Sequence, residues 1–98
     1  MNEINVPLQP KKVDVSIEYC VPCDYSDYAL GIARELIKNY QHVIDQLTFK
    51  MGTKGVFEVR VDGEVIFSKQ ERQRHPRPGE VLGSFKERIG PEVRAYAE

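Results

Sequence analysis

Two cysteines three positions apart, Cys20 and Cys23, are the residues of this chain whose types and spacing are best suited to chemistry, and they are its only cysteines. Such a C-x-x-C pair occurs in thiol–disulfide redox sites and in zinc sites, and the thiolate is the reactive form in both. The pair follows the alternating apolar segment 13–19 and precedes a segment with helical spacing. We therefore expect it where a strand leads into a helix. Unpaired N–H groups at a helix start stabilise a thiolate, so this position suits thiol chemistry.

The geometry of the pair permits a reversible disulfide. Neighbours three apart on a regular helix have Cβ atoms about 5–6 Å apart, whereas a disulfide needs about 3.5–4.5 Å. One cysteine must therefore lie outside the helix, and Cys20 fits that place. Pro22 is expected in the first helical turn, where it loses no needed N–H and stiffens the loop between the thiols; plain helix initiation is the alternative.

The surroundings predict a mildly acidic thiol. A helix terminus contributes at most about 2 kcal/mol, which corresponds to roughly 1.5 pKa units below the ordinary value of about 8.5. The carboxylates of Glu18, Asp24 and Asp27 oppose this effect. Such a thiol suits a reductant or an exchange catalyst better than a strong oxidant.

A zinc site is the alternative for the cysteine pair. Zinc needs four ligands, and the other good candidates, His42 and His75, lie in separate predicted loops, so one chain could complete the set only by sharing a site with a second. An iron–sulfur cluster meets the same shortage. We therefore expect no metal and no resident cofactor.

The elements that position the cysteines follow from periodicity and turn residues. Alternating or helically spaced apolar residues predict a strand at 13–19, a helix at 24–40, a strand at 46–51, a hairpin of strands 56–61 and 64–68 around Asp62-Gly63, a charged loop at 69–78 and a helix at 80–90. The helical crossover makes strand 46–51 parallel to the first. This order, β-α-β-β-β-α, predicts an α/β thioredoxin-like fold with a four-stranded mixed sheet and two helices.

Length and composition bound the rest. A chain of 98 residues with 41% hydrophobic and 30% charged residues and a net charge of −1 is expected to form one small domain. We assign 1–11 to a flexible extension, 12–91 to the domain and 92–98 to a tail. The charge balance gives no reason to expect nucleic acid as a partner, and the absence of an apolar segment of roughly 20 residues gives none to expect a membrane. A cytoplasmic location is expected.

At this point the sequence resembles the Rdx family, which contains selenoproteins W, T and H and their cysteine-only bacterial and archaeal relatives. The resemblance runs from about Val13 to Pro91, and its anchors are Tyr19-Cys20-x-x-Cys23 with Tyr25, Gly55-Val56-Phe57-Glu58-Val59, Ser68-Lys69, and the Pro76 loop leading to Leu82, Ile89 and Pro91. Two departures are Lys54, where the family often has a second glycine, and the Val21-Pro22 interior of the motif. The resemblance implies a small thiol–disulfide oxidoreductase of the selenoprotein W type.

The resemblance and the thioredoxin analogy assign the attacking sulfur differently. In thioredoxin the first cysteine is the more exposed one and attacks, which favours Cys20, with Cys23 resolving the mixed disulfide. In selenoprotein W, selenocysteine stands at the position that matches Cys23. The sequence leaves both open, and we favour Cys20 slightly.

Four further residues are candidates for substrate binding: Pro22, Gly55, Ser68 and Tyr25. Gly55 stands where thioredoxins place a cis-proline, and a residue without a side chain would let a peptide approach the sulfurs; a turn glycine is the alternative. Ser68 matches a family serine, with a local cap as the alternative. Tyr25 or Tyr28 would form an apolar rim. Phe57 and Tyr19 are expected in the core.

Expected partners are thiol- or disulfide-bearing proteins, with glutathione as a candidate reductant. The cluster Lys69, Arg72, Arg74, His75 and Arg77 could attract such an anion, although a charged loop is usually only solvated. His42 and His75 are expected to be exposed. A monomer or weak dimer is expected, and the alternative function is a non-catalytic, redox-responsive interaction module.

Overall fold

The computed structural model describes residues 11–97. Its regular elements are β1 (Val13–Cys20), α1 (Ser26–Tyr40), a single 3-10 turn (Gln41–Val43), β2 (Ile44–Gly52), β3 (Phe57–Val61), β4 (Glu64–Ser68), α2 (Lys69–Arg72) and α3 (Glu80–Ile89).

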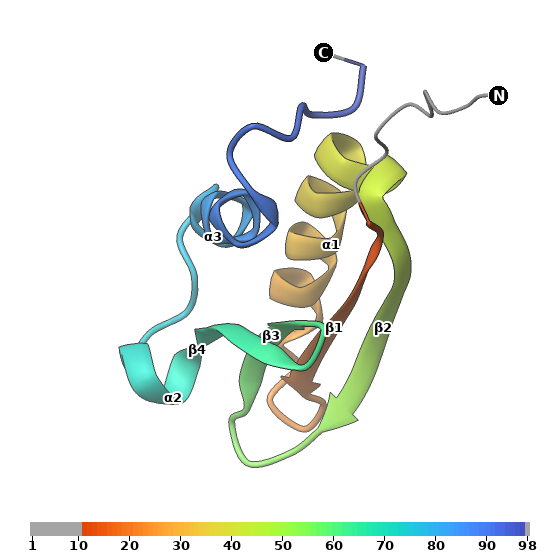
Figure 1. The fold of residues 1–98 in the computed structure, drawn as a ribbon. Coiled ribbons are helices and arrows are strands. Elements are labelled where there is room, and N and C mark those ends of the chain that lie inside the picture. Colours follow the sequence, from red (N-terminus) through yellow and green to blue (C-terminus); the bar gives the residue numbers. More distant parts are fainter. Residues whose placement is uncertain (1–10, 98) are drawn as a thin grey trace, which may run out of the picture.

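The strands form one mixed sheet in the order β2-β1-β3-β4, in which β1 runs parallel to β2 and antiparallel to β3, and β3 runs antiparallel to β4. Helices α1 and α3 pack on the same face of this sheet and contact each other (Figure 1). The loop between β1 and α1 lies at the same end of the molecule as the turn between β2 and β3. The thioredoxin-like arrangement predicted from the sequence is confirmed.

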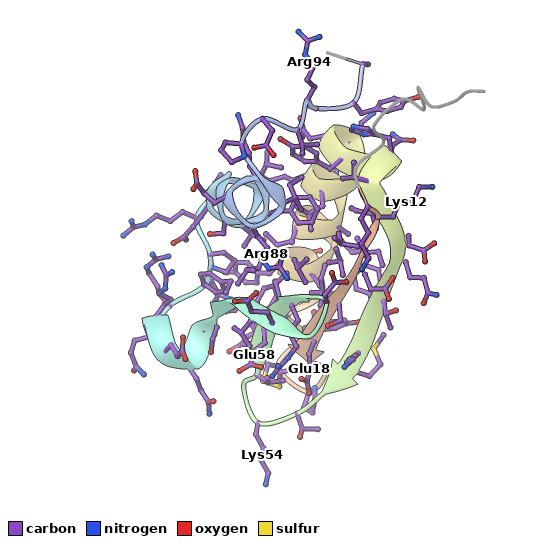
Figure 2. The ribbon with its side chains drawn as sticks, in the orientation of Figure 1. Lys12, Glu18, Lys54, Glu58, Arg88 and Arg94 are labelled. Carbon is purple, nitrogen blue, oxygen red and sulfur yellow. A yellow bond between two sulfur atoms is a disulfide. The ribbon has the colours of Figure 1, made fainter. Side chains whose placement is uncertain are left out.

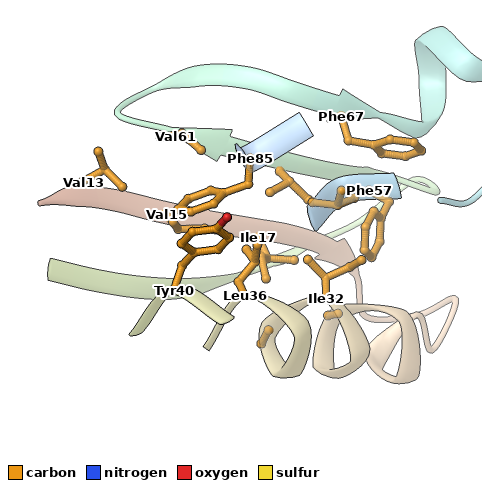
Figure 3. Packing of buried hydrophobic residues seen from close by; sticks show 14 of the residues in the cluster. Val13, Val15, Ile17, Ile32, Leu36, Tyr40, Phe57, Val61, Phe67 and Phe85 are labelled. Carbon is orange, nitrogen blue, oxygen red and sulfur yellow. The ribbon is translucent and has the colours of Figure 1, made fainter. Parts of the chain in front are cut away.

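The core lies between the sheet and the two long helices. Alternate residues of β1 and β3 point inward because successive side chains of a strand face opposite sides. Burying these apolar side chains is the main favourable term in folding. The fully buried large residues include Val15, Ile17, Leu36, Phe57, Phe67 and Phe85 (Figure 3).

The Asp62-Gly63 turn closes the β3–β4 hairpin as predicted. Both residues have positive φ, 50° and 84° respectively, which is the requirement of a type I′ turn. The Asp62 side chain also accepts a hydrogen bond from the backbone N–H of Asp14, while the Asp62 N–H donates to the Asp14 carbonyl. The turn is thereby fixed to the start of β1.

Three boundary predictions are wrong. Helix α1 begins at Ser26 instead of at position 24, because Asp24 adopts a positive φ of 55° that ends the preceding turn. The predicted loop 69–78 opens with the short helix α2, capped by Ser68. Strand β2 begins at Ile44, two residues before its predicted start at position 46, and Met51 near its end is 65% exposed at the edge of the sheet.

The segment after Pro91 lies against the core through Val93 and Ala95, and the N–H of Tyr96 donates to the carbonyl of Asn39. The predicted extension 1–11 falls almost wholly outside the described residues. Within residues 11–97, no helix combines the length and apolar character that a membrane crossing requires.

Glu80, the first residue of α3, binds the arginine-rich loop before it. Its carboxylate accepts hydrogen bonds from Arg74 at 2.8 Å, from Arg72 at 3.1 Å and from the backbone N–H of Arg77 at 3.0 Å. The Arg74 hydrogen bond is the largest cause that lowers the pKa of Glu80 from 4.5 to about 2. The loop is therefore tied to α3 while this carboxylate is ionised.

This clamp predicts acid-dependent stability. Because the pKa of Glu80 is lower in the folded than in the unfolded chain, its contribution is complete above pH 4.5 and is lost as the pH falls toward 2. Glu80→Gln is expected to lower the free energy of unfolding near neutral pH, and the difference from wild type should shrink to little near pH 2. Urea unfolding at both pH values measures it, with Glu87→Gln on the same helix as control. A difference that is unchanged at low pH would contradict this role.

Candidate redox site

Cys20 and Cys23 are joined by a disulfide, with their Cα atoms 5.3 Å apart. Cys20 is the last residue of β1, and Cys23 lies in the turn that follows. We call residues 20–25 the disulfide loop. Both cysteines therefore lie outside α1, which satisfies the expectation that Cys20 lies outside the helix.

Two nested backbone hydrogen bonds close the disulfide loop. The N–H of Asp24 donates to the carbonyl of Val21 at 2.9 Å, and the N–H of Tyr25 donates to the carbonyl of Cys20 at 3.2 Å. The Ser26 hydroxyl donates to the Asp24 carboxylate at 2.7 Å. Pro22 lies in this turn and not in the first helical turn, so helix initiation is not its role; its fixed φ stiffens the loop.

The two sulfurs differ sharply in exposure. Cys20 is 0% exposed, whereas Cys23 is exposed on the surface of the loop. The expectation that Cys20 is the more exposed cysteine is wrong, because Cys20 ends a central strand and Cys23 lies on the outside of the turn. The backbone N–H of Cys23 points back to Cys20 Sγ, with N and S 3.3 Å apart.

The turn between β2 and β3 holds the disulfide loop from the other side. The N–H of Cys20 donates to the carbonyl of Val56, and the N–H of Val21 donates to the carbonyl of Gly52, both at 2.9 Å. A Cβ at Gly52 would lie 2.6 Å from Val56 Cγ1 and 3.1 Å from Glu18 Oε2. Gly52 is therefore required for close packing beside Cys20, a role that sequence reasoning missed.

Gly55 belongs to this turn and has a φ of +76°, next to Lys54 with a φ of 59°. The N–H of Val56 donates to the carbonyl of Thr53, which closes the turn. The positive φ explains why a glycine occupies position 55 in this turn. A Cβ added there would meet no other atom within 4 Å. Figure 2 shows Lys54 projecting outward from the tip of this turn.

Ser68 lies two strands away from β1 and is 3% exposed. Its hydroxyl accepts a hydrogen bond from the N–H of Glu71 and donates to Glu58 Oε2, both at 3.3 Å. The local cap, the alternative weighed for this serine, is confirmed. These contacts occupy the hydroxyl that substrate binding would have used.

Tyr25, the last residue of the disulfide loop, packs in an aromatic group with residues from α1 and the loop before α3. The His75 ring stacks on Tyr28 at 3.7 Å between centroids and meets Tyr25 edge-on at 4.4 Å. Lys69 Nζ lies 5.5 Å from the centre of the Tyr25 ring. Tyr25 is half-buried and Tyr28 is exposed, so Tyr28 contributes more to an accessible rim.

Two arginines of the predicted basic cluster are paired within the chain. Arg72 and Arg74 are bound to Glu80, and His75 is half-buried instead of exposed. Burial, and secondarily the Lys69 ammonium, lower the pKa of His75, which favours its neutral form. Of the two histidines, His42 is exposed as expected, and its Nε2 lies 3.0 Å from the carbonyl oxygen of Arg94.

The residues near the cysteines do not form a metal site. Among residues 11–97, no three or more histidine, cysteine or acidic side chains are placed together as ligands. The disulfide loop and the turn that contains Gly55 lie at one end of the molecule, where backbone hydrogen bonds join them, whereas the Ser68 hydroxyl caps α2. The site is thus a surface disulfide on a fixed turn.

A four-stranded mixed sheet with a C-x-x-C disulfide between its first strand and first helix defines the thioredoxin-like class of proteins. Solved structures agree: a selenoprotein W-related protein from Vibrio cholerae superposes with a TM-score of 0.77 at 20% identity over 82% of this chain and 100% of that one. A Bordetella parapertussis protein gives a TM-score of 0.73 at 19% identity over 79% of this chain and 98% of that one.

The Rdx family profile matches residues 14–87, and the chain belongs to the Rdx family. Curated relatives include migration and invasion enhancer 1 from Mus musculus and from Bos taurus, each 26% identical over 74 residues. That match covers 76% of this chain and 63% of each relative. Membership of this family and the Cys20–Cys23 disulfide together indicate a redox-related function.

Proposed function

We propose that this protein is a small thiol–disulfide oxidoreductase that reduces disulfides on partner proteins through Cys20 and Cys23. The observation that carries the proposal is the contrast between the two sulfurs, one exposed and one fully buried within a fixed loop. An exposed sulfur can meet a partner, and a buried one three residues away can only meet the first. A two-step exchange requires one thiol that attacks the partner and a second that resolves the mixed disulfide.

In the first step, the Cys23 thiolate attacks one sulfur of the partner disulfide. A bond forms between Cys23 Sγ and that sulfur, and the partner's second sulfur leaves as a thiolate that takes a proton from water. In the second step, Cys20 loses its proton and attacks Cys23 Sγ, which forms the internal disulfide and releases the partner's first sulfur. Two electrons pass to the partner, and Cys20 and Cys23 are oxidised.

Reduction of the internal disulfide reverses these roles. A glutathione thiolate can approach Cys23 Sγ, because Cys23 is exposed, but not Cys20 Sγ. Its attack forms a bond to Cys23 and expels Cys20 as a thiolate. The Cys23 N–H, 3.3 Å from Cys20 Sγ, then faces the leaving charge, and hydrogen bonds from N–H groups stabilise an anion. A second glutathione thiolate attacks the glutathione sulfur, releases Cys23 as a thiolate and yields oxidised glutathione.

The experiment that tests this function is equilibration of the full chain with mixtures of reduced and oxidised glutathione. The Cys20–Cys23 disulfide is expected to open and close reversibly while the protein stays folded, since its loop is held by backbone hydrogen bonds that do not involve the sulfurs. A disulfide that opens only when the protein unfolds would argue for a structural bond.

A further inference from the structure

Exposed apolar side chains gather beside the disulfide loop, where α1 meets β2. Val21, Leu30 and Met51 are 48%, 59% and 65% exposed. Between α1 and β2 lies a groove of about 110 Å³, lined by Tyr19, Ser26, Ala29, Leu30, Phe49 and Met51. We call it the α1–β2 groove. Contiguous apolar surface next to a reactive group marks a place where another molecule binds.

The groove runs beside an unpaired strand edge. β2 is nine residues long and is an outer strand of the sheet formed by residues 11–97 (Figure 1). An edge strand offers backbone N–H and C=O groups that only another extended polypeptide satisfies in a regular way. β2 also runs toward the site, since its last residue, Gly52, pairs with Cys20. A segment bound along β2 would therefore end at the disulfide loop.

An unpaired cation beside the groove favours an acidic residue in its occupant. Arg34 follows Leu30 by one helical turn and therefore lies next to it on the surface of α1. It is exposed, and within the described chain it has no ion pair. Four other arginines, Arg60, Arg72, Arg74 and Arg88, each bind a glutamate.

We propose that the α1–β2 groove docks an extended, disulfide-bearing segment of a partner protein in which apolar residues alternate with acidic ones. Its backbone pairs with the outer edge of β2, its apolar side chains cover Leu30 and Met51, and its acidic side chains meet Arg34. Its sulfur then reaches Cys23. The inference rests on the proposed function, because the occupant is defined by the sulfur that it delivers.

The experiment compares three probes of the reduced full chain. Two are ten-residue peptides with one cysteine activated as a 2-pyridyl disulfide, in which apolar residues alternate either with glutamate or with lysine; the third is 2-hydroxyethyl 2-pyridyl disulfide, which is neutral and too small to dock. Release of pyridine-2-thione gives each rate. The rate of each peptide is divided by the rate of the small disulfide. This ratio is expected to be at least roughly tenfold larger for the acidic peptide than for the basic one, which corresponds to about 1.4 kcal/mol of preference.

Variants connect this preference to the groove. Leu30→Glu is expected to lower the acidic peptide's rate about tenfold relative to the small disulfide, and Arg34→Glu is expected to shift the preference toward the basic peptide. Val65→Glu, an exposed apolar residue on β4 and so at the opposite edge of the sheet, should change neither ratio.

Four results would overturn the docking proposal. Equal relative rates for both peptides, or ratios that Leu30→Glu leaves unchanged, would show that the groove does not select the substrate while leaving the redox function intact. A dimer in sedimentation that Leu30→Glu dissociates would assign the groove to a second copy. Failure to react with the small disulfide would instead remove the proposed function itself, and the docking proposal with it.

Discussion

The Cys20→Ser protein is expected to form a stable mixed disulfide with a partner or with glutathione through Cys23, whereas Cys23→Ser is expected to form none. Cys23 is exposed and can attack, but in Cys20→Ser no second thiol is present to release the adduct. In Cys23→Ser the remaining thiol, Cys20, is 0% exposed and cannot meet an external disulfide while the chain is folded. The expected effect is complete loss of adduct, not a partial decrease.

Intact mass after incubation with oxidised glutathione measures the adduct in both variants. The wild-type protein is the control and should instead end with the Cys20–Cys23 disulfide. Treatment in denaturant should make both variants react equally, because the difference comes from burial and not from residue type. An adduct on Cys20 in folded Cys23→Ser would reverse the assignment and restore the thioredoxin-like order of attack.

Phe57→Ala is expected to have the largest effect on stability. Phe57 is 0% exposed and packs edge-on against Phe67, at 6.4 Å between ring centroids, and close to Tyr28 and His75. Removing a fully buried phenylalanine costs about 3–5 kcal/mol, which is a large part of the roughly 5–15 kcal/mol that stabilises a typical domain. Because Phe57 directly follows Val56, whose carbonyl binds the Cys20 N–H, the disulfide loop should loosen too.

Urea unfolding of oxidised protein gives the free energy for this variant. Val65→Ala, at a position that is 36% exposed on β4, is the matched control and should stay within about 0.5 kcal/mol of wild type. A loss below about 1 kcal/mol for Phe57→Ala would mean that the core under the site collapses around the vacancy or is not tightly packed.

The fold could be predicted because its signals are local and agree with one another. The alternation in β1, the apolar spacing along α1 and the Asp62-Gly63 turn each specify one element, and their order leaves few arrangements. Boundaries were less accurate because they depend on single dihedral angles. Asp24, with its positive φ, delays the helix, and nothing in the identity of an aspartate requires that conformation.

The site could be located but not fully described from the sequence. The spacing of Cys20 and Cys23 predicts the disulfide, yet which sulfur is buried depends on the direction in which β1 delivers Cys20 into the sheet. The contacts of Gly52 and Val56 are made by backbone groups, which carry no residue-specific signal. A glycine at the end of a strand, followed closely by a second turn glycine, is the one hint that the sequence offered.

The partners of the charged loop residues could not be read from their own segment. Arg72 and Arg74 were predicted as members of a basic cluster, but Glu80, eight and six residues further along the chain, pairs with both. His75 likewise was expected in solvent, but the loop turns its ring onto Tyr28. A count of charges in one segment therefore says little about binding until their neighbours are known.

The central claim is that Cys20 and Cys23 cycle between disulfide and dithiol in the folded protein. The most direct measurement is the fraction of disulfide, by mass after acid quenching and alkylation, across a series of glutathione redox buffers, with a folding probe recorded in the same samples. The account expects a single reversible transition, the same from either direction, with the fold retained throughout. A disulfide that persists in fully reduced glutathione, or that is lost only together with the fold, would contradict it.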